Sequence, residues 1–592
     1  MARYEAGPRR SQSAAGALLL AAALCGGLAR SAWAQMGDVG GGASGGGNLP
    51  AAGEPAPSAG SLLQGGPPQP DGFSGFGGSG DLSAVPGQSM RDRINSALGL
   101  QQTPSNASQP AWQFVPAVSL QQGWTSNAQG IPGAAVAGQP AYITIVNPSL
   151  AVTFDSVRLQ GGVAYAPTLT VYEPNRGETS IAQNLSGHAH ATLLPDLLFV
   201  DLSGVAMQQT ITGSLGPTGT LVPSNSNTAQ DYSFSLTPYL LHQFGTFGTG
   251  ELGGSIGETA QLVNSGTFAA VQPGLPPTAI ASQHATSTEE HIAFTSGSGF
   301  GRWLSQAYIS ASQESGTGVL DGAFHNTLSY EAGYAITRRA IALATIGWDD
   351  LHYAGVPPVN VNSPLWNVGV QFLPNPDSTI TLRYGRKDGI DAPFVSAVYT
   401  PTARTRLTAN YSVTISTDQQ QLGNDLAAAT LDNTGAQVNA NTGQPLLASN
   451  NFLGLMTSVY RLEQASITGS LLLDRDTLLL GINHSREKSL NIVGSSNTQL
   501  PDVTGTSGQF SWSHDMSLAV KTTVFLQYGV TESSFGATRQ SSDVFVGGAQ
   551  VAYLLSNTLS ATLQYSHTYS AFRSPIPLFS SDFVLAGVRK TF

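Results

Sequence analysis

The sequence predicts an all-β protein, a large transmembrane antiparallel β-barrel of about 22 strands. Charged residues make up only 10% of the 592-residue chain, against roughly 25% in ordinary soluble domains. No run of about 18 apolar residues occurs after the N-terminal segment, which excludes membrane-spanning helices. From Trp112 onward apolar and polar residues alternate, which is typical of strands with one apolar and one polar face.

The first 34 residues have the three parts of a secretory signal peptide. Basic residues come first, followed by the apolar run Ala14–Leu24 and the A-x-A cleavage motif Ala32-Trp33-Ala34. We therefore predict that residues 1–34 are removed before Gln35. The only cysteine, Cys25, leaves with this segment, so we expect neither a disulfide nor thiol chemistry in the mature chain.

Two other interpretations of this segment fit less well. A twin-arginine signal at Arg9-Arg10 lacks the apolar residue expected after it, and a lipoprotein Cys25 would need a small residue in place of Leu24. Removing the four Arg and one Glu of the signal leaves 21 basic and 35 acidic residues, a net charge of −14. This acidic balance gives no support to nucleic acid as a partner.

Residues 35–110 are rich in Gly, Pro and Ser, and such a composition cannot bury enough apolar surface to offset its conformational entropy. We predict a disordered periplasmic segment. Within it, Ser89–Gln101 places Met90, Ile94, Ala97 and Leu98 on one helical face, so it is either a short amphipathic helix or a transient helix in a linker.

Residues 111–592 are predicted to form the barrel. In Thr405–Ile415 and in Leu559–Tyr565 every second residue is apolar and the residues between them are polar. Tight turns recur between Asp155 and Asn557 and are separated by longer, Gly-rich connections, of which Thr417–Gly454 is the longest. This asymmetry is typical of a bacterial outer-membrane barrel. The turns indicate 22 strands, and the ambiguous region Asp231–Gly301 leaves 18 or 20 open.

A turn with two aromatic residues at a fixed spacing occurs in three stretches, Phe372–Gly385, Tyr399–Ser412 and Tyr553–Ser566. We assign the first aromatic of each to a periplasmic girdle, and the second, twelve residues on, to an outer girdle about one membrane crossing away. The first group is Phe372, Tyr399 and Tyr553, and the second is Tyr384, Tyr411 and Tyr565.

The C-terminal residues resemble the signal by which barrels are recognised for insertion, an alternating strand that ends on an aromatic residue. Val584, Ala586, Val588 and Phe592 share one face. Lys590 departs from this pattern, and a lysine at the interface can extend its ammonium group into water at modest cost.

Motifs for catalysis lack the context that they need. GFGGSG (Gly75–Gly80) follows no strand, and GGSIG (Gly253–Gly257) lies inside a predicted strand. His188 and His190 share a strand face, but no third metal ligand is identifiable, and Glu289 and Glu290 face opposite sides. We expect no enzyme activity, no cofactor and no metal site.

The inner face of the barrel remains as the functional surface. Hydroxyl and amide side chains dominate it and suit a hydrated channel or contact with carbohydrate. Scattered basic residues would favour anionic solutes, or would be ordinary lining without selectivity. These residues are Arg383, Lys387, Arg406, Lys521 and Arg589.

Four segments resemble a known family. FVPAVSLQQGWTSN (Phe114–Asn127) is similar to its opening strand, although Gln122, Trp124 and Ser126 replace the usual Glu, Tyr and Asp. YITIVNPSLAVTF with RLQGGVAYAPTLTVY is similar to its second and third strands, and PLWNVGVQFLPNPDSTITLRYGRKDG to its mid-barrel hairpin. The chain thus resembles the outer-membrane β-barrel family associated with the PEP-CTERM/exosortase system and exopolysaccharide loci.

The resemblance implies an integral protein of the outer membrane of a Gram-negative bacterium, an accessory or exit component of exopolysaccharide biosynthesis or export. Its expected partners are outer-membrane lipid, the barrel assembly machinery, polysaccharide and periplasmic polysaccharide-export proteins. The alternatives are a general or substrate-selective porin and a non-conducting structural or assembly barrel. A plugged 22-stranded receptor would need a folded N-terminal domain, for which residues 35–110 are too short and too rich in Gly.

Overall fold

The computed structural model describes twelve segments: residues 112–128, 139–173, 179–210, 228–263, 267–270, 278–421, 429–431, 437–439, 458–491, 502–535, 538–572 and 579–592. The predicted signal peptide, the Gly/Pro/Ser-rich segment and the helix at Ser89–Gln101 lie outside the described residues. These three assignments stay predictions.

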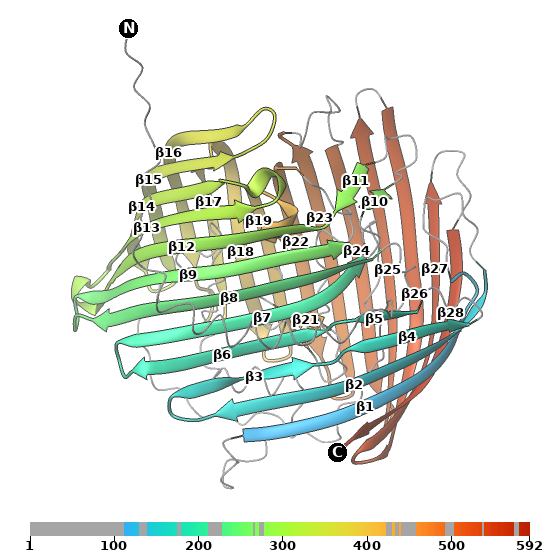
Figure 1. Cartoon of the computed structure of the whole chain (residues 1–592). Coiled ribbons are helices and arrows are strands. Elements are labelled where there is room, and N and C mark those ends of the chain that lie inside the picture. Colours follow the sequence, from blue (N-terminus) through green and yellow to red (C-terminus); the bar gives the residue numbers. More distant parts are fainter. Residues whose placement is uncertain are drawn as a thin grey trace. The chain divides into compact units, whose positions relative to one another are not determined.

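The described residues form a closed antiparallel barrel of 22 crossings, so the predicted fold class and the highest of the three strand counts are confirmed (Figure 1). Two crossings consist of two short strands each, β3 with β4 and β5 with β6. The strands of the wall are β1 (Trp112–Thr125), β2 (Ala141–Asp155), β3 (Leu159–Tyr165), β4 (Thr168–Glu173), β5 (Ser180–Ala182), β6 (Leu185–Leu194), β7 (Leu198–Thr210), β8 (Thr228–Gln243), β9 (Gly248–Val263), β12 (Gln283–Ser296), β13 (Trp303–Gly316), β14 (Phe324–Thr337), β15 (Ala340–Tyr353), β16 (Val359–Phe372), β17 (Thr379–Lys387), β18 (Ile390–Thr402), β19 (Thr405–Ser416), β22 (Tyr460–Leu472), β23 (Asp476–Ser489), β24 (Asp502–Asp515), β25 (Val520–Phe535), β26 (Thr538–Ser556), β27 (Leu559–Phe572) and β28 (Phe579–Thr591).

In the parts of the connections that the structure describes lie four short strands and two 3-10 helices. They are the hairpin β10 (Thr267–Ala270) and β11 (Thr278–Ala281), the hairpin β20 (Ala429–Leu431) and β21 (Gln437–Asn439), and the helices η3 (Ser298–Phe300) and η4 (Gly318–Leu320). Within the described residues, no helix is long and apolar enough to cross a bilayer.

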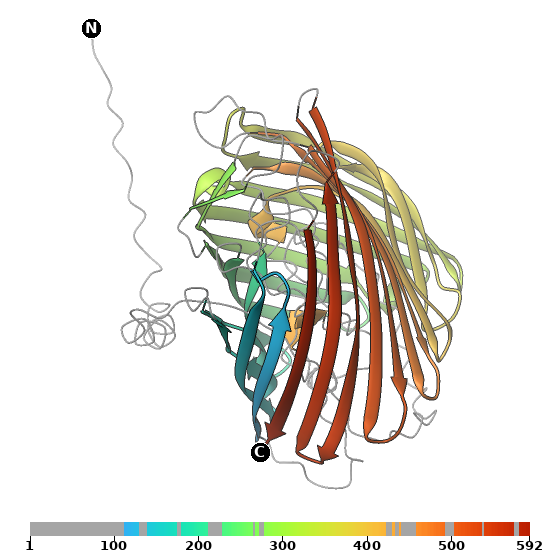
Figure 2. The same ribbon diagram turned by 90° about the vertical axis from the view of Figure 1, so that its right-hand side faces the viewer.

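The wall closes where its first and last strands meet. β1 pairs with β28 from Ala117 opposite Thr591 to Thr125 opposite Phe583, and Figure 2 shows the two strands side by side. The amide of Phe592 adds one more hydrogen bond, of 2.9 Å, to the carbonyl of Pro116. This pairing leaves neither β1 nor β28 as an open edge of the sheet, and closing the sheet satisfies backbone groups that lipid could not.

The outer face carries an apolar band. Large apolar side chains point away from the lumen on all sides of the wall, for example Leu120, Ile292, Ile346, Val368, Leu480 and Leu563, each more than half exposed. In water such a surface would drive aggregation, whereas in a bilayer it matches the lipid.

The height of this band can be measured on β1. Phe114 and Trp124 both point outward from it and lie ten residues apart. That is about 33 Å along a strand, or about 25 Å along the axis of a barrel whose strands tilt by about 40°, the height of an outer-membrane apolar band. The barrel therefore spans the outer membrane, with the short turns at its periplasmic end.

The three turn-and-aromatic repeats cover less height than the sequence predicted. Phe372 lies opposite Ile380, and Tyr384 lies only four residues beyond Ile380, about 13 Å along the strand. Tyr411 and Tyr565 follow the same pattern, four residues beyond the partners of Tyr399 and Tyr553. The first eight of the twelve residues form the turn and bring the chain back to the level of the first aromatic residue. The expectation of one full crossing between the two aromatics was wrong.

Candidate functional site

The inner face of β14 to β17 carries a continuous run of polar side chains. Alternation along the strands directs them into the lumen, while Ile346, Val368 and Tyr384 on the same strands point outward. The inward residues, mostly buried, are His325, Thr327, Ser329, Glu331, Thr345, Asp349, Asn367, Arg383 and Lys387.

Arg383 and Glu331 form the centre of this run. Nη1 and Nη2 of Arg383 lie 2.6 and 3.1 Å from the two carboxylate oxygens of Glu331, a bidentate pair. The guanidinium group also donates to the hydroxyl oxygen of Thr345 and to Oδ1 of Asn367. The four residues come from four successive strands, and the ion pair is almost completely buried. The pair therefore fastens this part of the wall from inside.

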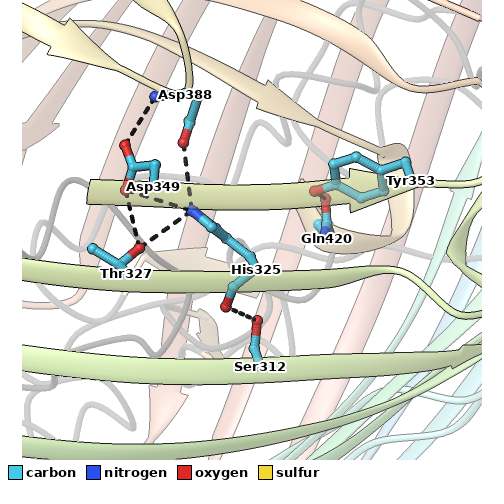
Figure 3. A network of polar contacts seen from close by, with 7 residues as sticks. All are labelled: Ser312, His325, Thr327, Asp349, Tyr353, Asp388 and Gln420. Atoms are coloured by element: carbon cyan, nitrogen blue, oxygen red, sulfur yellow. Dashed lines mark hydrogen bonds and ion pairs between the residues drawn. The ribbon is translucent and has the colours of Figure 1, made fainter. Parts of the chain in front are cut away.

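A second cluster lies nearer the extracellular end (Figure 3). Nε2 of His325 lies 3.5 Å from Oδ1 of Asp388 and 4.0 Å from Oδ1 of Asp349. The hydroxyl of Thr327 donates to Oδ1 of Asp349 at 3.2 Å, and the backbone amide of Asp388 donates to Oδ2 at 3.1 Å. His325 comes from β14, Asp349 from β15, and Asp388 from the turn after β17.

The connection that follows β19 turns inward over this wall. Residues 418–421 form one helical turn. Oε1 of Gln420 accepts from the hydroxyl of Tyr353 at 2.9 Å, and its Nε2 donates to Oε1 of Glu314 at 2.8 Å. Gln420 thus ties the start of this connection to β15 and β13, as Figure 3 shows for Tyr353.

Apolar packing supports the same closure. Side chains from β12, β15, η4 and the residue before β22 form one buried cluster, which consists of Ala285, Val319, Leu320, Ala323, Leu351, Tyr353 and Val459. Asn491, just after β23, donates to the carbonyl of Ala354 and accepts from the amide of Val459. We call this cluster, together with Gln420 and Asn491, the inner closure. It joins strands from well-separated parts of the wall.

The same connection also reaches the other side of the barrel. Strand β20 contacts β6, and β6 stands eleven crossings from β19 in a wall of 22. The described strand β20 of this connection therefore lies beside β6, on the opposite side of the wall from β19.

A third group lines β6 to β13 in the half of the wall next to the short turns. His190 pairs with Asp201 at 2.6 Å and stacks on Phe199, which stacks on Tyr239. On the neighbouring strands, His291 pairs with Glu251 at 2.9 Å and stacks on Tyr308, whose hydroxyl donates to Glu289. We call these eight residues the aromatic–carboxylate belt: His190, Phe199, Asp201, Tyr239, Glu251, Glu289, His291 and Tyr308.

Gly253 separates the two halves of the belt. It pairs with Tyr239 on one side and with His291 on the other. A Cβ at this position would lie 2.5 Å from Cε1 of His291, so a glycine is required to admit the imidazole ring. The GGSIG stretch lies within β9 and shows no strand–turn–helix context, as the sequence indicated.

The structure places all five predicted lumen cations on the inner side of their strands. Arg406 lies next to the outward Leu407, Lys521 shares the face of the buried Gln527, and Arg589 follows the outward Val588. Two of the five are neutralised, however. Arg383 is paired with Glu331, and Lys387 is attracted by both carboxylates of the second cluster. The expected preference for anionic solutes does not follow from these two residues.

The predicted girdle aromatics lie on the outer face. Phe372, Tyr384, Tyr399, Tyr553 and Tyr565 are each more than a third exposed, and Tyr411 donates to Glu463 at 2.7 Å. In the C-terminal strand, Val584, Ala586 and Val588 also point outward, and Phe592 is 71% exposed. Lys590 reaches the hydroxyl of Thr558 in the β26–β27 turn at 2.6 Å, which places its charge at the periplasmic rim.

Sequence reasoning missed the second cluster, Gln420 and most of the belt. His325, Asp349 and Asp388 lie too far apart in the sequence to form a recognisable motif. The belt had a partial signal, because the sequence placed His190 and Glu289 on predicted strands. Asp201 and Glu251, the partners of His190 and His291, became visible only with the strand register.

No protein-family model matches the sequence, and no curated protein matches it. Solved structures of similar outline exist. The siderophore receptor PirA from Acinetobacter baumannii is 9% identical over 81% of this chain and 80% of its own, with a TM-score of 0.42. The apoprotein form of the FrpB iron transporter from Neisseria meningitidis is 10% identical over 84% of this chain and 83% of its own, with a TM-score of 0.39.

Identities and TM-scores this low transfer neither a ligand nor a partner to this chain. What the architecture itself establishes is narrower. The wall is closed, its outer face is an apolar band of bilayer height, and its inner face is polar. The chain is an integral β-barrel protein of the outer membrane, in contact with membrane lipid.

Proposed function

We propose that this barrel is a gated passage through the outer membrane for a hydroxyl-rich polymer, as an exit or accessory component of exopolysaccharide export. The role is passage and not catalysis. The sequence resemblance to barrels of exopolysaccharide loci supports this class of cargo, and the inner face supports it independently.

The observation that carries the proposal is the aromatic–carboxylate belt. Its rings offer flat apolar surfaces, on which the C–H faces of a sugar ring can pack. Its carboxylates accept hydrogen bonds from hydroxyl groups. Both kinds of group are distributed over six neighbouring strands, β6 to β9, β12 and β13, so a chain of sugars would meet them repeatedly along its path.

The inner closure supplies the gate. Its polar links, at Gln420 and Asn491, are single hydrogen bonds between groups that water could satisfy equally well. Each such bond contributes about 1 kcal/mol net, so breaking the polar links costs little free energy. Opening must also separate the apolar side chains of the cluster.

A substrate-selective porin is the second candidate, favoured by the three carboxylates of the belt, Asp201, Glu251 and Glu289. They would select neutral or cationic solutes over anions. A non-conducting structural barrel is the third candidate. It is favoured by the burial of inward residues such as Thr345 and Gln371, which are 1% and 4% exposed.

Deleting the gene and measuring extracellular polysaccharide, with the purified barrel studied in planar bilayers, separates the three candidates. The proposal expects polymer to be lost from the medium and trapped in the periplasm, and the barrel to show conductance that oligosaccharides block. Conductance with normal polymer secretion would favour the porin. Normal secretion with no conductance would favour the structural barrel, and either result would overturn the proposal.

A further inference from the structure

The second cluster contains three groups that are common metal ligands. One ring nitrogen of His325 and one oxygen each of Asp349 and Asp388 all lie within 4.8 Å of one another. Ligands bound tetrahedrally to one metal ion at 2.0–2.2 Å are about 3.3–3.6 Å apart. The separations of 3.5 and 4.0 Å from His325 are already close to this value. Small side-chain rotations would bring all three atoms to one ion.

The carboxylate of Asp349 is held in place by two hydrogen bonds. Oδ2 of Asp349 accepts the backbone amide of Asp388, which leaves Oδ1 directed toward His325 and the hydroxyl of Thr327. Such outer contacts orient the ligands of a metal site. Thr327 lies near enough for its hydroxyl to orient a water molecule as a fourth ligand.

Asp388 has an atom without a hydrogen bond. The residue is 3% exposed, and among the described residues its Oδ1 accepts no hydrogen bond, although it points at Nε2 of His325. A buried carboxylate oxygen in this condition is costly unless a cation is close. The Asp-Gly turn explains why Asp occupies a left-handed position, at φ 49°. It does not explain why the carboxylate is buried and directed at the histidine.

The charges around the cluster are compatible with a divalent cation. Two carboxylates attract one ammonium group, that of Lys387, and a neutral imidazole adds no charge. A divalent ion would change the net charge of the group from −1 to +1, and would place a cation at the oxygen of Asp388 that accepts no hydrogen bond.

We propose that His325, Asp349 and Asp388 form a binding site for a divalent transition-metal ion, with Zn²⁺ the preferred ion. An imidazole nitrogen with two carboxylate oxygens is a common Zn²⁺ ligand set, and the stability order of such ligands favours Zn²⁺ over Mn²⁺ and Fe²⁺. The ion would join β14, β15 and the β17–β18 turn just below the inner closure. The site is independent of the cargo proposed above.

The test is calorimetric titration of Zn²⁺ into the full-length barrel, purified folded in detergent and treated with a chelator. Asp388→Asn is the decisive variant, because Asn tolerates the left-handed turn and all ten histidines of the chain are retained. Asp350→Asn is the matched control, since Asp350 is the next residue after Asp349 and lies on the outer face, where it accepts from Asn362.

The site predicts one Zn²⁺ per chain in the wild type and in Asp350→Asn, with affinity reduced at least about tenfold in Asp388→Asn. Co²⁺ should give visible absorption bands in the same two proteins and lose them in His325→Gln. Heat-modifiable mobility in gel electrophoresis checks that each variant is a folded barrel. Equal affinity in Asp388→Asn, or no binding by the folded wild type, would falsify the proposal and leave His325 as an ion-pair partner only.

Discussion

Arg383 on β17 and Glu331 on β14 meet across the two strands that separate them and form two hydrogen bonds of 2.6 and 3.1 Å. Neither residue is near the other in sequence, with 52 positions between them. Because both side chains are buried, removing one would leave the other as an uncompensated charge.

Arg383→Ala is therefore expected to destabilise the barrel by about 3–5 kcal/mol. The double variant Arg383→Ala/Glu331→Ala should lose much less than the sum of the two single losses, since no charge is then left alone. Denaturant midpoints of the barrel in lipid vesicles measure both quantities. Arg386→Ala is the control, because the Arg386–Asp391 pair is more than a third exposed and an exposed pair contributes about 0–1 kcal/mol.

Gln420→Ala should loosen the inner closure. It removes the hydrogen bonds to Tyr353 and Glu314, together worth about 2 kcal/mol, which corresponds to a rise of roughly 10- to 30-fold in the ratio of open to closed channels. Single-channel recording measures this ratio. Gln421→Ala is the matched control, because the side chain of Gln421 donates to Ser416 at the end of β19 and, among the described residues, has no hydrogen bond to another strand of the wall. Similar open probabilities in the two variants would remove Gln420 from the gate.

The belt predicts a specific loss of sugar binding. Tyr239→Leu and Tyr308→Leu each remove an inward ring and hydroxyl, and each should raise the oligosaccharide concentration that half-blocks the channel by about tenfold, the effect of losing about 1.4 kcal/mol of stacking and hydrogen bonding. Tyr330→Leu, on the outer face, should leave the blocking concentration unchanged. If all three variants behave alike, the belt does not contact the cargo.

The outer band predicts where a charge is tolerated. Ile346 is 66% exposed in the middle of β15, so Ile346→Lys should destabilise the barrel by about 2–4 kcal/mol. Val157 is 96% exposed, but it lies in a periplasmic turn, and Val157→Lys should cost less than about 1 kcal/mol. Folding yields in lipid vesicles at increasing denaturant compare the two. An equal cost would mean that the apolar band has been placed at the wrong height.

The architecture was predictable because patterns among neighbouring residues determine it. Alternation assigns Leu382 and Tyr384 to one face and Arg383 to the other from neighbouring residues alone, and turn chemistry marks the ends of strands. The site was not predictable, because its contacts depend on which strand lies beside which and in what register. That is why Arg383 looked like a free lumen cation until Glu331 was placed opposite it. The height between Phe372 and Tyr384 was overestimated because it too depends on the register, here of β16 with β17.

The seam between β1 and β28 constrains how the chain matures. Thr125 and Ser581 contact each other across it, 456 positions apart in the sequence. Until the last strand has been made and delivered, the growing sheet keeps two edges that can pair with any other chain. The protein must therefore cross the periplasm as an unclosed and aggregation-prone intermediate. Its need for escort and for ordered insertion therefore comes from the position of a single strand pair as well as from the apolar outer face.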